Sequence, residues 1–354
     1  MTAMTRSSDP PIPRHLTNWA DLPDDVWDRC LDRAAHHGRA REWSDAARGR
    51  ALGLLFFNPS LRTRTSMELA AAHLGAFPTV LTPGQGTWNL EWRPDVRMDG
   101  DKAEHVREAV GVLARYVDAL GVRTFASLAD READRQDAAF RAVVDASTVP
   151  VVNLESARWH PCQALADAAA LREHYGGDVG GRRFVLSWAP HPNPLPRAVP
   201  NSALLTAARL GMEVVIARPE GYGLDADVMA TARETAARHG GSVAETDDQD
   251  GALDGAHAVY AKAWAGEGVY DDRAAEAARR TALPDWRITD AKMDRTADGV
   301  FMHCLPVRRG VVVDGSVLDG PQTGGPRAIH LLQAEYRLHA QKAVLEWVWD
   351  LLPA

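Results

Sequence analysis

The sequence predicts an α/β protein with two domains, each a parallel sheet flanked by helices, and three observations support this class. The chain of 354 residues is too long for one ordinary core and suits two. Hydrophobic residues make up 45% and charged residues 25%, which is the balance of a globular protein. Short apolar runs alternate with helical patterns along most of the length, as strand–helix–strand units require.

The first predicted strand and helix surround a polar turn. Leu52–Phe57 is a short apolar run that Asn58-Pro59 ends, which indicates a buried strand. A helical pattern follows over residues 64–74. The apolar face of this helix consists of Met67, Ala70, Ala71 and Leu74.

The rest of the chain continues the alternation. Further predicted strands cover residues 150–154, 184–188, 213–217, 258–261, 300–304 and 328–331, with helical patterns at 167–175 and 227–239 between them. A new series begins after the glycine-rich turn at Gly181, so we expect a boundary within residues 156–180. The last segment, 335–351, is predicted to be a helix that returns to the first domain. The two domains then comprise residues 14–160 with 335–354, and residues 161–334.

Charge and cysteine usage exclude several classes of function. The formal net charge of −8, without a basic block, argues against nucleic acid or an anionic membrane as partner. No stretch is long and apolar enough to span a bilayer, and residues 1–13 lack the apolar core of a leader. Three scattered cysteines lack metal-ligand spacing and suit a reducing, cytoplasmic location. No G-x-G-x-x-G follows a predicted strand, which counts against a dinucleotide-dependent oxidoreductase.

The turn Ser60-Leu61-Arg62-Thr63-Arg64 is the strongest local signal for a ligand. It stands between a predicted strand and the start of a helix, where free N–H groups and the helix dipole favour phosphate. Two hydroxyl groups and two guanidinium groups at the same turn add charge-assisted hydrogen bonds. Because the motif is short, a polar turn with two solvated arginines remains open as the alternative.

Four further polar clusters follow the ends of predicted strands. They are Arg158-Trp-His160-Pro-Cys-Gln163, Trp188-Ala-Pro-His191-Pro192, Tyr260-Ala-Lys262-Ala-Trp264 and His303-Cys-Leu-Pro306. Each alone is explained equally well by capping or packing. Open α/β sheets, however, bind ligands at the carboxyl ends of their strands, and five clusters at such ends favour a site.

These motifs, together with Gly121-Val-Arg123, resemble the aspartate/ornithine carbamoyltransferase family, in order from about residue 50 to the C-terminus. The resemblance implies a carbamoyl-phosphate-binding domain at 14–160 with 335–354 and an amino-acid-binding domain at 161–334. The Ser-Met-Gly signature of enzymes acting on free ornithine is absent. The loop Gly86–Glu91 and the segment Tyr260–Trp264 look like the branch that acts on N-acylated ornithine.

The acyl group depends on few positions. Acetyl-type enzymes resemble Met98-Asp-Gly-Asp101 but carry a glutamate where this chain has Ala103, and a lysine where it has Val312. A glutamate would repel a succinyl carboxylate, whereas Ala103 leaves room for it. We therefore favour N-succinylornithine, with N-acetylornithine as the alternative, since succinyl-type enzymes have proline at the position of Ala103.

The resemblance also implies the roles of individual residues. For carbamoyl phosphate they are Ser60, Leu61, Arg62, Thr63, Trp88, Arg123, His160, Pro161, Cys162, Gln163, Cys304, Leu305 and Arg337, with Arg62, Thr63, Arg123, His160 and Cys304 as the catalytic set. For the acylornithine they are Glu155, His191, Lys262, Leu305 and Arg308. Trp88 is expected to reach the site of a neighbouring subunit in a homotrimer.

The implied reaction is attack of the neutral δ-amine on the carbonyl carbon of carbamoyl phosphate, which gives an N-acylcitrulline and phosphate in arginine biosynthesis. It needs no metal, cofactor or covalent intermediate, so catalysis rests on positioning and oxyanion stabilisation. The residues do not identify a proton acceptor for the δ-amine. A non-catalytic relative that binds carbamoyl phosphate, or a transferase for an unusual amine, remain as rival interpretations.

Overall fold

The structure is a computed structural model that describes residues 13–320 and 327–353. The expectation about a leader concerns residues 1–13, nearly all of which lie outside this range. No helix within the described ranges is long and apolar enough to cross a membrane.

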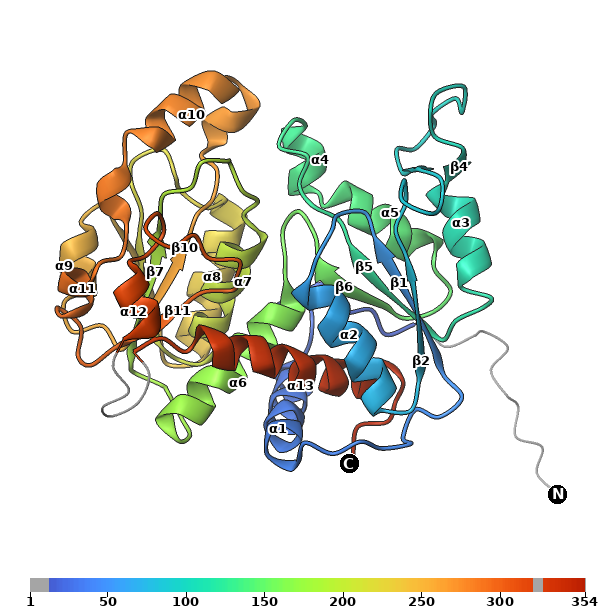
Figure 1. Ribbon diagram of the computed structural model, residues 1–354, viewed down its shortest axis with the longest axis horizontal. Helices are drawn as coiled ribbons and strands as arrows, with labels where there is room; N and C mark the ends of the chain where they lie inside the picture. Colours follow the sequence, from blue (N-terminus) through green and yellow to red (C-terminus); the bar gives the residue numbers. More distant parts are fainter. Residues whose placement is uncertain (1–12, 321–326, 354) are drawn as a thin grey trace.

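Four parallel strands form the first sheet, in the order β2-β1-β5-β6 (Figure 1). The strands are β1 (Ala51–Phe56), β2 (Phe77–Leu81), β5 (Ala119–Arg123) and β6 (Val151–Glu155). The helices of this part are α1 (Asp24–Ala40), α2 (Arg62–His73), α3 (Val106–Leu113), α4 (Arg131–Arg135) and α5 (Ala138–Ala146). β1 is buried along nearly its whole length, which explains its continuous apolar sequence.

The loop between β2 and α3 carries a small sheet of its own. Its strands β3 (Leu90–Glu91) and β4 (Glu104–His105) are parallel. The buried Glu91 carboxylate accepts hydrogen bonds from Arg93 and Lys102 and so holds the two arms of the loop together. Figure 1 shows this loop beside α3, on the side of the first domain remote from the second sheet.

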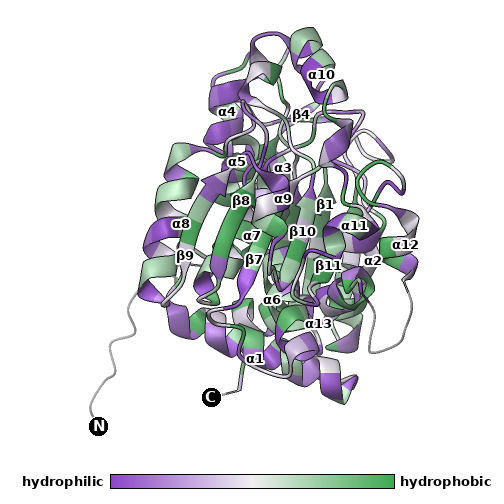
Figure 2. Cartoon of the chain, turned by 90° about the vertical axis from the view of Figure 1, so that its left-hand side faces the viewer, coloured by the Kyte–Doolittle hydropathy of each residue, from purple (hydrophilic) through white to green (hydrophobic). Residues whose placement is uncertain are grey.

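Five parallel strands form the second sheet, in the order β11-β10-β7-β8-β9. The strands are β7 (Arg183–Trp188), β8 (Glu213–Ala217), β9 (Ser242–Thr246), β10 (Ala258–Lys262) and β11 (Val300–Met302). The helices are α7 (Ala198–Arg209), α8 (Ala226–Arg238), α9 (Gln249–Leu253), α10 (Arg273–Thr281), α11 (Asp290–Met293) and α12 (Gly315–Asp319), with 3-10 turns η1 (Glu267–Tyr270) and η2 (Pro284–Trp286). Figure 2 shows hydrophobic central strands between helices with polar outer faces, the pattern of a sheet covered on both sides.

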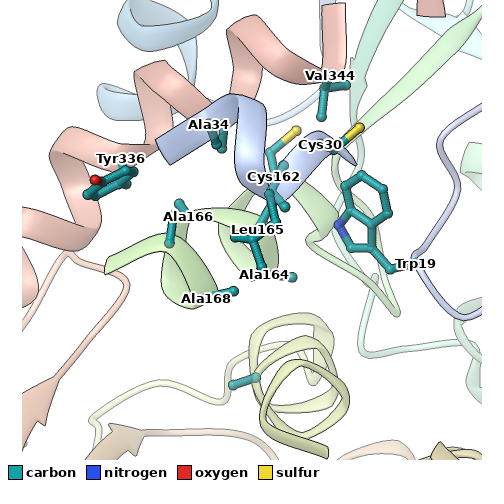
Figure 3. Packing of buried hydrophobic residues seen from close by; sticks show 14 of the residues in the cluster. Trp19, Cys30, Ala34, Cys162, Ala164, Leu165, Ala166, Ala168, Tyr336 and Val344 are labelled. Carbon is teal, nitrogen blue, oxygen red and sulfur yellow. The ribbon is translucent and has the colours of Figure 1, made fainter. Parts of the chain in front are cut away.

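Two helices, α6 (Pro161–Tyr175) and α13 (His330–Val348), join the two sheets. α13 packs on α6, α1 and α2, and Figure 1 shows it crossing the lower side of the molecule. Figure 3 shows part of the apolar cluster at this junction, with Cys30 from α1, Cys162 from α6 and Val344 from α13. Residues 161–171 are all buried, so α6 is a core helix rather than an amphipathic surface helix.

The predicted fold class is confirmed: two parallel sheets are flanked by helices, and the last helix returns to the first sheet. The strand predicted at 328–331 is wrong, because α13 begins at His330 and only Ala328 forms an isolated bridge, with Phe301. A short apolar run does not distinguish a strand from the start of a buried helix.

Five strands had not been predicted: the two-residue strands β3 and β4, and β2, β5 and β9 of the two large sheets. β2 contains Pro78 and β9 is partly exposed, and both are edge strands with weak apolar patterns. In β5 the pattern is interrupted by Gly121, where an added Cβ would lie 2.7 Å from a Leu54 methyl carbon. Close packing between neighbouring strands therefore explains this glycine.

Candidate active site

The first turn of α2 places Arg62 inward and Arg64 outward. The Ser60 hydroxyl oxygen accepts a hydrogen bond from the Thr63 amide at 3.1 Å, which fixes the first turn of the helix. Arg64 is exposed and lies 3.5 Å from Glu68 along the same helix. Arg62 is half-buried; burial lowers its pKa, and the Cys304 and Arg123 groups lie near enough to affect it. Arg62 thus faces the ends of other strands, as a phosphate ligand would require.

The ends of β5 and β6 bring Arg123 and Glu155 together. Their Cα atoms are paired across the two strands, and an Arg123 guanidinium N–H donates to the Glu155 carboxylate. The His160 Nε2 atom lies 3.5 Å from the same carboxylate. Within the described part of the chain, the buried Arg123 Nε and His160 Nδ1 atoms have no hydrogen-bond partner. Unpartnered buried polar atoms are costly, so these two groups are suited to a polar ligand.

His160 is held neutral. Burial lowers the pKa of its imidazole well below the usual value, and the positive charges of Arg337, Arg123 and Lys262 lower it further. A neutral imidazole with an unpartnered ring nitrogen can donate a hydrogen bond to a carbonyl oxygen without adding a charge to the site. This arrangement suits the stabilisation of charge that develops on such an oxygen.

Arg337 of α13 completes the group from the other end of the sequence. Its guanidinium donates to the Gln163 side-chain oxygen at 2.8 Å and to the Thr63 hydroxyl at 3.0 Å. It is 3% exposed, and no acidic side chain within residues 13–320 and 327–353 forms a salt bridge with it. A buried cation in this state favours an anionic ligand.

The segment after β11 faces this group from the second sheet. The His303 Nδ1 atom accepts from the Leu305 amide at 2.8 Å, and Leu305 has a φ of 58° in the left-handed region. Burial raises the pKa of Cys304, so its side chain is a neutral thiol rather than a thiolate. Burial lowers the pKa of the His303 imidazole well below its usual value, and the charge of Lys262, at the end of β10, lowers it further.

His191 and Arg308 also meet at this edge. The Arg308 Nε–H donates to His191 Nε2 at 2.9 Å, which requires the imidazole proton to be on Nδ1. That Nδ1 atom lies 2.8 Å from the Asn193 carbonyl oxygen and can donate to it. These two of the five predicted acylornithine ligands are therefore neighbours, although they are 117 residues apart.

Three predicted residues are placed differently from the rest. The Cys162 side chain lies in the apolar cluster of Figure 3, where burial raises its pKa to about 12. Trp88 is 60% exposed, and its indole N–H donates to Glu104 at 2.6 Å within its own loop. Ala103 is exposed next to Glu104. Trp88 and Ala103 therefore both lie on the loop between β2 and α3.

Two buried polar residues beside Gln163 had not been singled out. Asp167 accepts from Gln163 Nε2 at 2.7 Å, and Gln333 donates to the same carboxylate oxygen at 2.7 Å. Both are at most 3% exposed. The signal in the sequence was an acidic residue within the otherwise apolar run of α6, which is rare unless the charge is paired or hydrogen-bonded.

Comparison with known proteins agrees with this geometry. Residues 14–173 match the model of the aspartate/ornithine carbamoyltransferase carbamoyl-P binding domain, and residues 197–348 match that of the Asp/Orn binding domain. An N-acetylornithine carbamoyltransferase of Xanthomonas campestris pv. campestris is 41% identical over 94% of this chain and 96% of that protein. An N-succinylornithine carbamoyltransferase of Bacteroides fragilis is 38% identical over 88% of this chain and 91% of that protein.

A solved structure is equally similar. It is a glutamate-to-alanine variant of N-acetyl-L-ornithine transcarbamylase, complexed with carbamyl phosphate and N-succinyl-L-norvaline, with a TM-score of 0.91 and 41% identity. The similarity covers 95% of this chain and 99% of that one. The chain belongs to the aspartate/ornithine carbamoyltransferase family, in its N-acylornithine branch.

Proposed function

We propose that this carbamoyltransferase moves the carbamoyl group of carbamoyl phosphate to the δ-amine of N-succinylornithine, with N-succinylcitrulline and phosphate as products. The observation that carries the proposal is the convergence of Arg62, Arg123, His160 and Arg337, of which the last three contain buried nitrogen atoms without partners in the described structure. Such a set matches an anion that also has a carbonyl oxygen.

The site residues divide by chemistry. Ser60, the Leu61 amide, Arg62, Thr63 and Arg337 bind the phosphate group. Thr63, Arg123 and His160 polarise the carbamoyl oxygen, and Gln163, Cys304 and Leu305 hold the carbamoyl amide. The δ-amine nitrogen attacks the carbonyl carbon, the bond from that carbon to the phosphate oxygen breaks, and the leaving phosphate is basic enough to take the proton.

The unit that binds carbamoyl phosphate is proposed to comprise residues 14–160 with 335–354. The packing of α13 on α1 and α2, and the Arg337–Thr63 bond, support this assignment. Residues 161–334 then bind the acylornithine through His191, Lys262, Leu305 and Arg308. Glu155, at the end of β6 in the first unit, also contributes to this site. The positive side chains of Lys262 and Arg308 are suited to bind the carboxylates of an acylated amino acid.

The succinyl group is favoured by two small apolar residues. Ala103 adds no charge where an acidic side chain would repel a succinate carboxylate. Val312 is 2% exposed and packs in the apolar cluster beneath the second sheet, so it brings no cation or anion to the acyl pocket. In the N-acetylornithine transcarbamylase, a glutamate-to-alanine variant was crystallised with an N-succinyl ligand.

N-acetylornithine is the second candidate, because the N-acetylornithine relative shares 41% of its residues with this chain and the N-succinylornithine relative 38%. A parallel assay of ureido product from carbamoyl phosphate with ornithine, N-acetylornithine and N-succinylornithine separates the two. We expect the highest kcat/KM for N-succinylornithine and almost no product from ornithine.

Ala103→Glu should shift this preference toward N-acetylornithine, by about tenfold in the ratio of the two kcat/KM values, since one repulsive contact is of the order of 1–2 kcal/mol. Ala230→Glu, at an exposed position on α8, is the matched control and should leave the ratio unchanged. A ratio that Ala103→Glu does not alter would remove this residue from the acyl pocket.

Trp88 is proposed to complete the site of a neighbouring subunit in a homotrimer, with the reaction serving arginine biosynthesis in the cytoplasm. Its 60% exposure and its position on the loop remote from the second sheet support a contact outside its own chain. Mixing the inactive variants Trp88→Ala and Arg62→Ala after dissociation should restore activity, because some sites then receive an intact Trp88 and an intact Arg62 from different chains.

The control for this mixing experiment is Trp43→Ala, which removes another exposed tryptophan that contacts His73 of its own chain. It should be active alone. Absence of any activity in the mixed sample, with hybrid oligomers verified by mass, would place Trp88 outside the neighbouring site.

A further inference from the structure

A chain of buried hydrogen bonds runs from the end of β11 to the start of α2. The His303 amide donates to the Gln333 side-chain oxygen at 2.9 Å, and Gln333 Nε2 donates to Asp167 Oδ1 at 2.7 Å. The same Oδ1 accepts from Gln163 Nε2, whose amide oxygen accepts from Arg337. All five residues are at most 3% exposed. This series of hydrogen bonds therefore connects the end of β11 to the residues beside the first sheet, and burial shields it from bulk water.

The groups at the two ends of this hydrogen-bond series, the His303 amide and the Arg337 guanidinium, fix the donor and the acceptor of every bond in it. A backbone N–H and a guanidinium can only donate, and an ionised carboxylate can only accept. The Gln333 oxygen must therefore face His303 and its NH2 group must face Asp167. In the same way, the Gln163 oxygen must face Arg337 and one of its N–H groups must face Asp167. Neither amide can rotate by 180° without opposing like groups.

We propose that Asp167 and Gln333 are positioning residues that set the orientation of the Gln163 amide and, through it, of the Arg337 guanidinium for carbamoyl phosphate. This inference rests on the proposed carbamoyl-phosphate site. One N–H of Gln163 is directed to Asp167, which leaves the second for the ligand. Because Gln333 also receives the His303 amide, the positions of the His303–Pro306 segment and of the phosphate site are coupled.

The surroundings of Asp167 support an ionised acceptor at neutral pH. Burial raises the pKa of its carboxyl to about 6, while the hydrogen bonds from Gln163 and Gln333 oppose the increase. The charged and titratable groups that face it are Arg337 on α13, Tyr260 on β10 and Cys304 after β11. Arg337 is the one cation among them, so a second carboxylate in contact with Asp167 would be strongly disfavoured.

Gln333→Glu tests the proposal, because it keeps the acceptor for His303 but places a carboxyl group against Asp167. Two carboxyl groups in contact share one proton and lose it at a raised, joint pKa. At pH 6 the variant should be near the wild type. As the pH rises to 9, the shared proton is lost, the two carboxylates repel, and KM for carbamoyl phosphate should rise by about tenfold or more, the effect of one or two buried hydrogen bonds.

Two controls separate positioning from a general effect of burial. Gln249→Glu introduces a carboxyl at another buried glutamine, on α9, and should show the pH profile of the wild type. The double variant Asp167→Asn/Gln333→Glu contains one carboxyl and one amide in exchanged positions. The increase in KM for carbamoyl phosphate at high pH should therefore be absent from this variant. The readouts are kcat, KM for carbamoyl phosphate and calorimetric binding of carbamoyl phosphate alone, each at pH 6 to 9.

The possible outcomes are distinct. The inference is overturned if Gln333→Glu has the pH profile of the wild type. It is also overturned if KM for carbamoyl phosphate rises at high pH in the double variant as much as in the single one. If the wild type binds carbamoyl phosphate but forms no product from any acylornithine, the proposed reaction fails and the calorimetric arm still decides the positioning role. A wild type that does not bind carbamoyl phosphate overturns both.

Discussion

Arg62→Ala is expected to lower kcat/KM by about 10²- to 10³-fold, which corresponds to about 3–4 kcal/mol of transition-state stabilisation at about 1.4 kcal/mol per factor of ten. Arg62 is the half-buried arginine of the first turn of α2, and its charge lies near those of Arg123 and Glu155. Negative charge moves onto the phosphate as the carbon–oxygen bond breaks. A guanidinium fixed at this position therefore binds the transition state more tightly than the ground state.

Arg64→Ala is the matched control for this prediction, since it removes the same side chain from the same helical turn. Arg64 is exposed, and its closest acidic group, Glu68, is one helical turn away at 3.5 Å. Exposed ion pairs of this type contribute at most about 1 kcal/mol. Steady-state kinetics with carbamoyl phosphate as the varied substrate should show a large loss for Arg62→Ala and almost none for Arg64→Ala. Equal effects of the two changes would contradict an inward phosphate ligand at Arg62.

Arg337→Lys should have the second largest effect, a loss of about a hundredfold in kcat/KM with most of it in KM for carbamoyl phosphate. The Arg337 guanidinium donates to Gln163 and Thr63 at 2.8 and 3.0 Å at the same time. A lysine ammonium is a point charge and does not reproduce this planar, two-sided geometry. The charge is kept, so the loss measures orientation rather than electrostatic attraction.

Arg209→Lys controls for the cost of changing a buried arginine. Arg209 is 6% exposed, donates to the Trp19 carbonyl oxygen at 2.6 Å and pairs with Asp24, all at the junction of α7 with the segment before α1. In both variants the free energy of unfolding should fall, by about 1–3 kcal/mol for each buried group left without a hydrogen-bond partner. Only Arg337→Lys should weaken the binding of carbamoyl phosphate in calorimetry, and a normal affinity in that variant would argue against its role at the phosphate.

Much of the site was predictable because parallel strands end at the same edge of a sheet. The turn at Ser60 and the segment before His160 follow β1 and β6, two predicted strands of one sheet, so both lie at the same edge of that sheet. Arg123 ends β5, which the apolar pattern did not predict, and only the resemblance indicated this residue. The same argument applied to Lys262 and His303, which follow the adjacent strands β10 and β11. The resemblance to a known family supplied the chemical roles that proximity alone does not define.

Contacts between distant segments required the tertiary structure. Arg337 contacts Thr63 and Gln163 only because of the angle at which α13 packs on α2 and α6. Hydrophobic periodicity does not predict the packing angle between helices. Asp167 and Gln333 could be recognised as unusual polar residues, but their hydrogen-bond directions follow only from the positions of His303 and Arg337. The strand predicted at 328–331 was wrong for the same reason: the tertiary packing of α13, which begins at His330, stabilises a helix in this segment.

The sequence by itself determined the α/β class, the positions of the six strands β1, β6, β7, β8, β10 and β11, and the five polar clusters at strand ends, because apolar periodicity and the turn residues are local properties of the chain. Only the tertiary structure decided which arginine of the Ser60 turn faces inward, that Cys162 packs in the core, and that Gln163 and Gln333 both donate to Asp167. The physical reason is that burial and hydrogen-bond pairing depend on which segments pack together, and in this chain α13 brings Arg337 within hydrogen-bond distance of Thr63, 274 positions away.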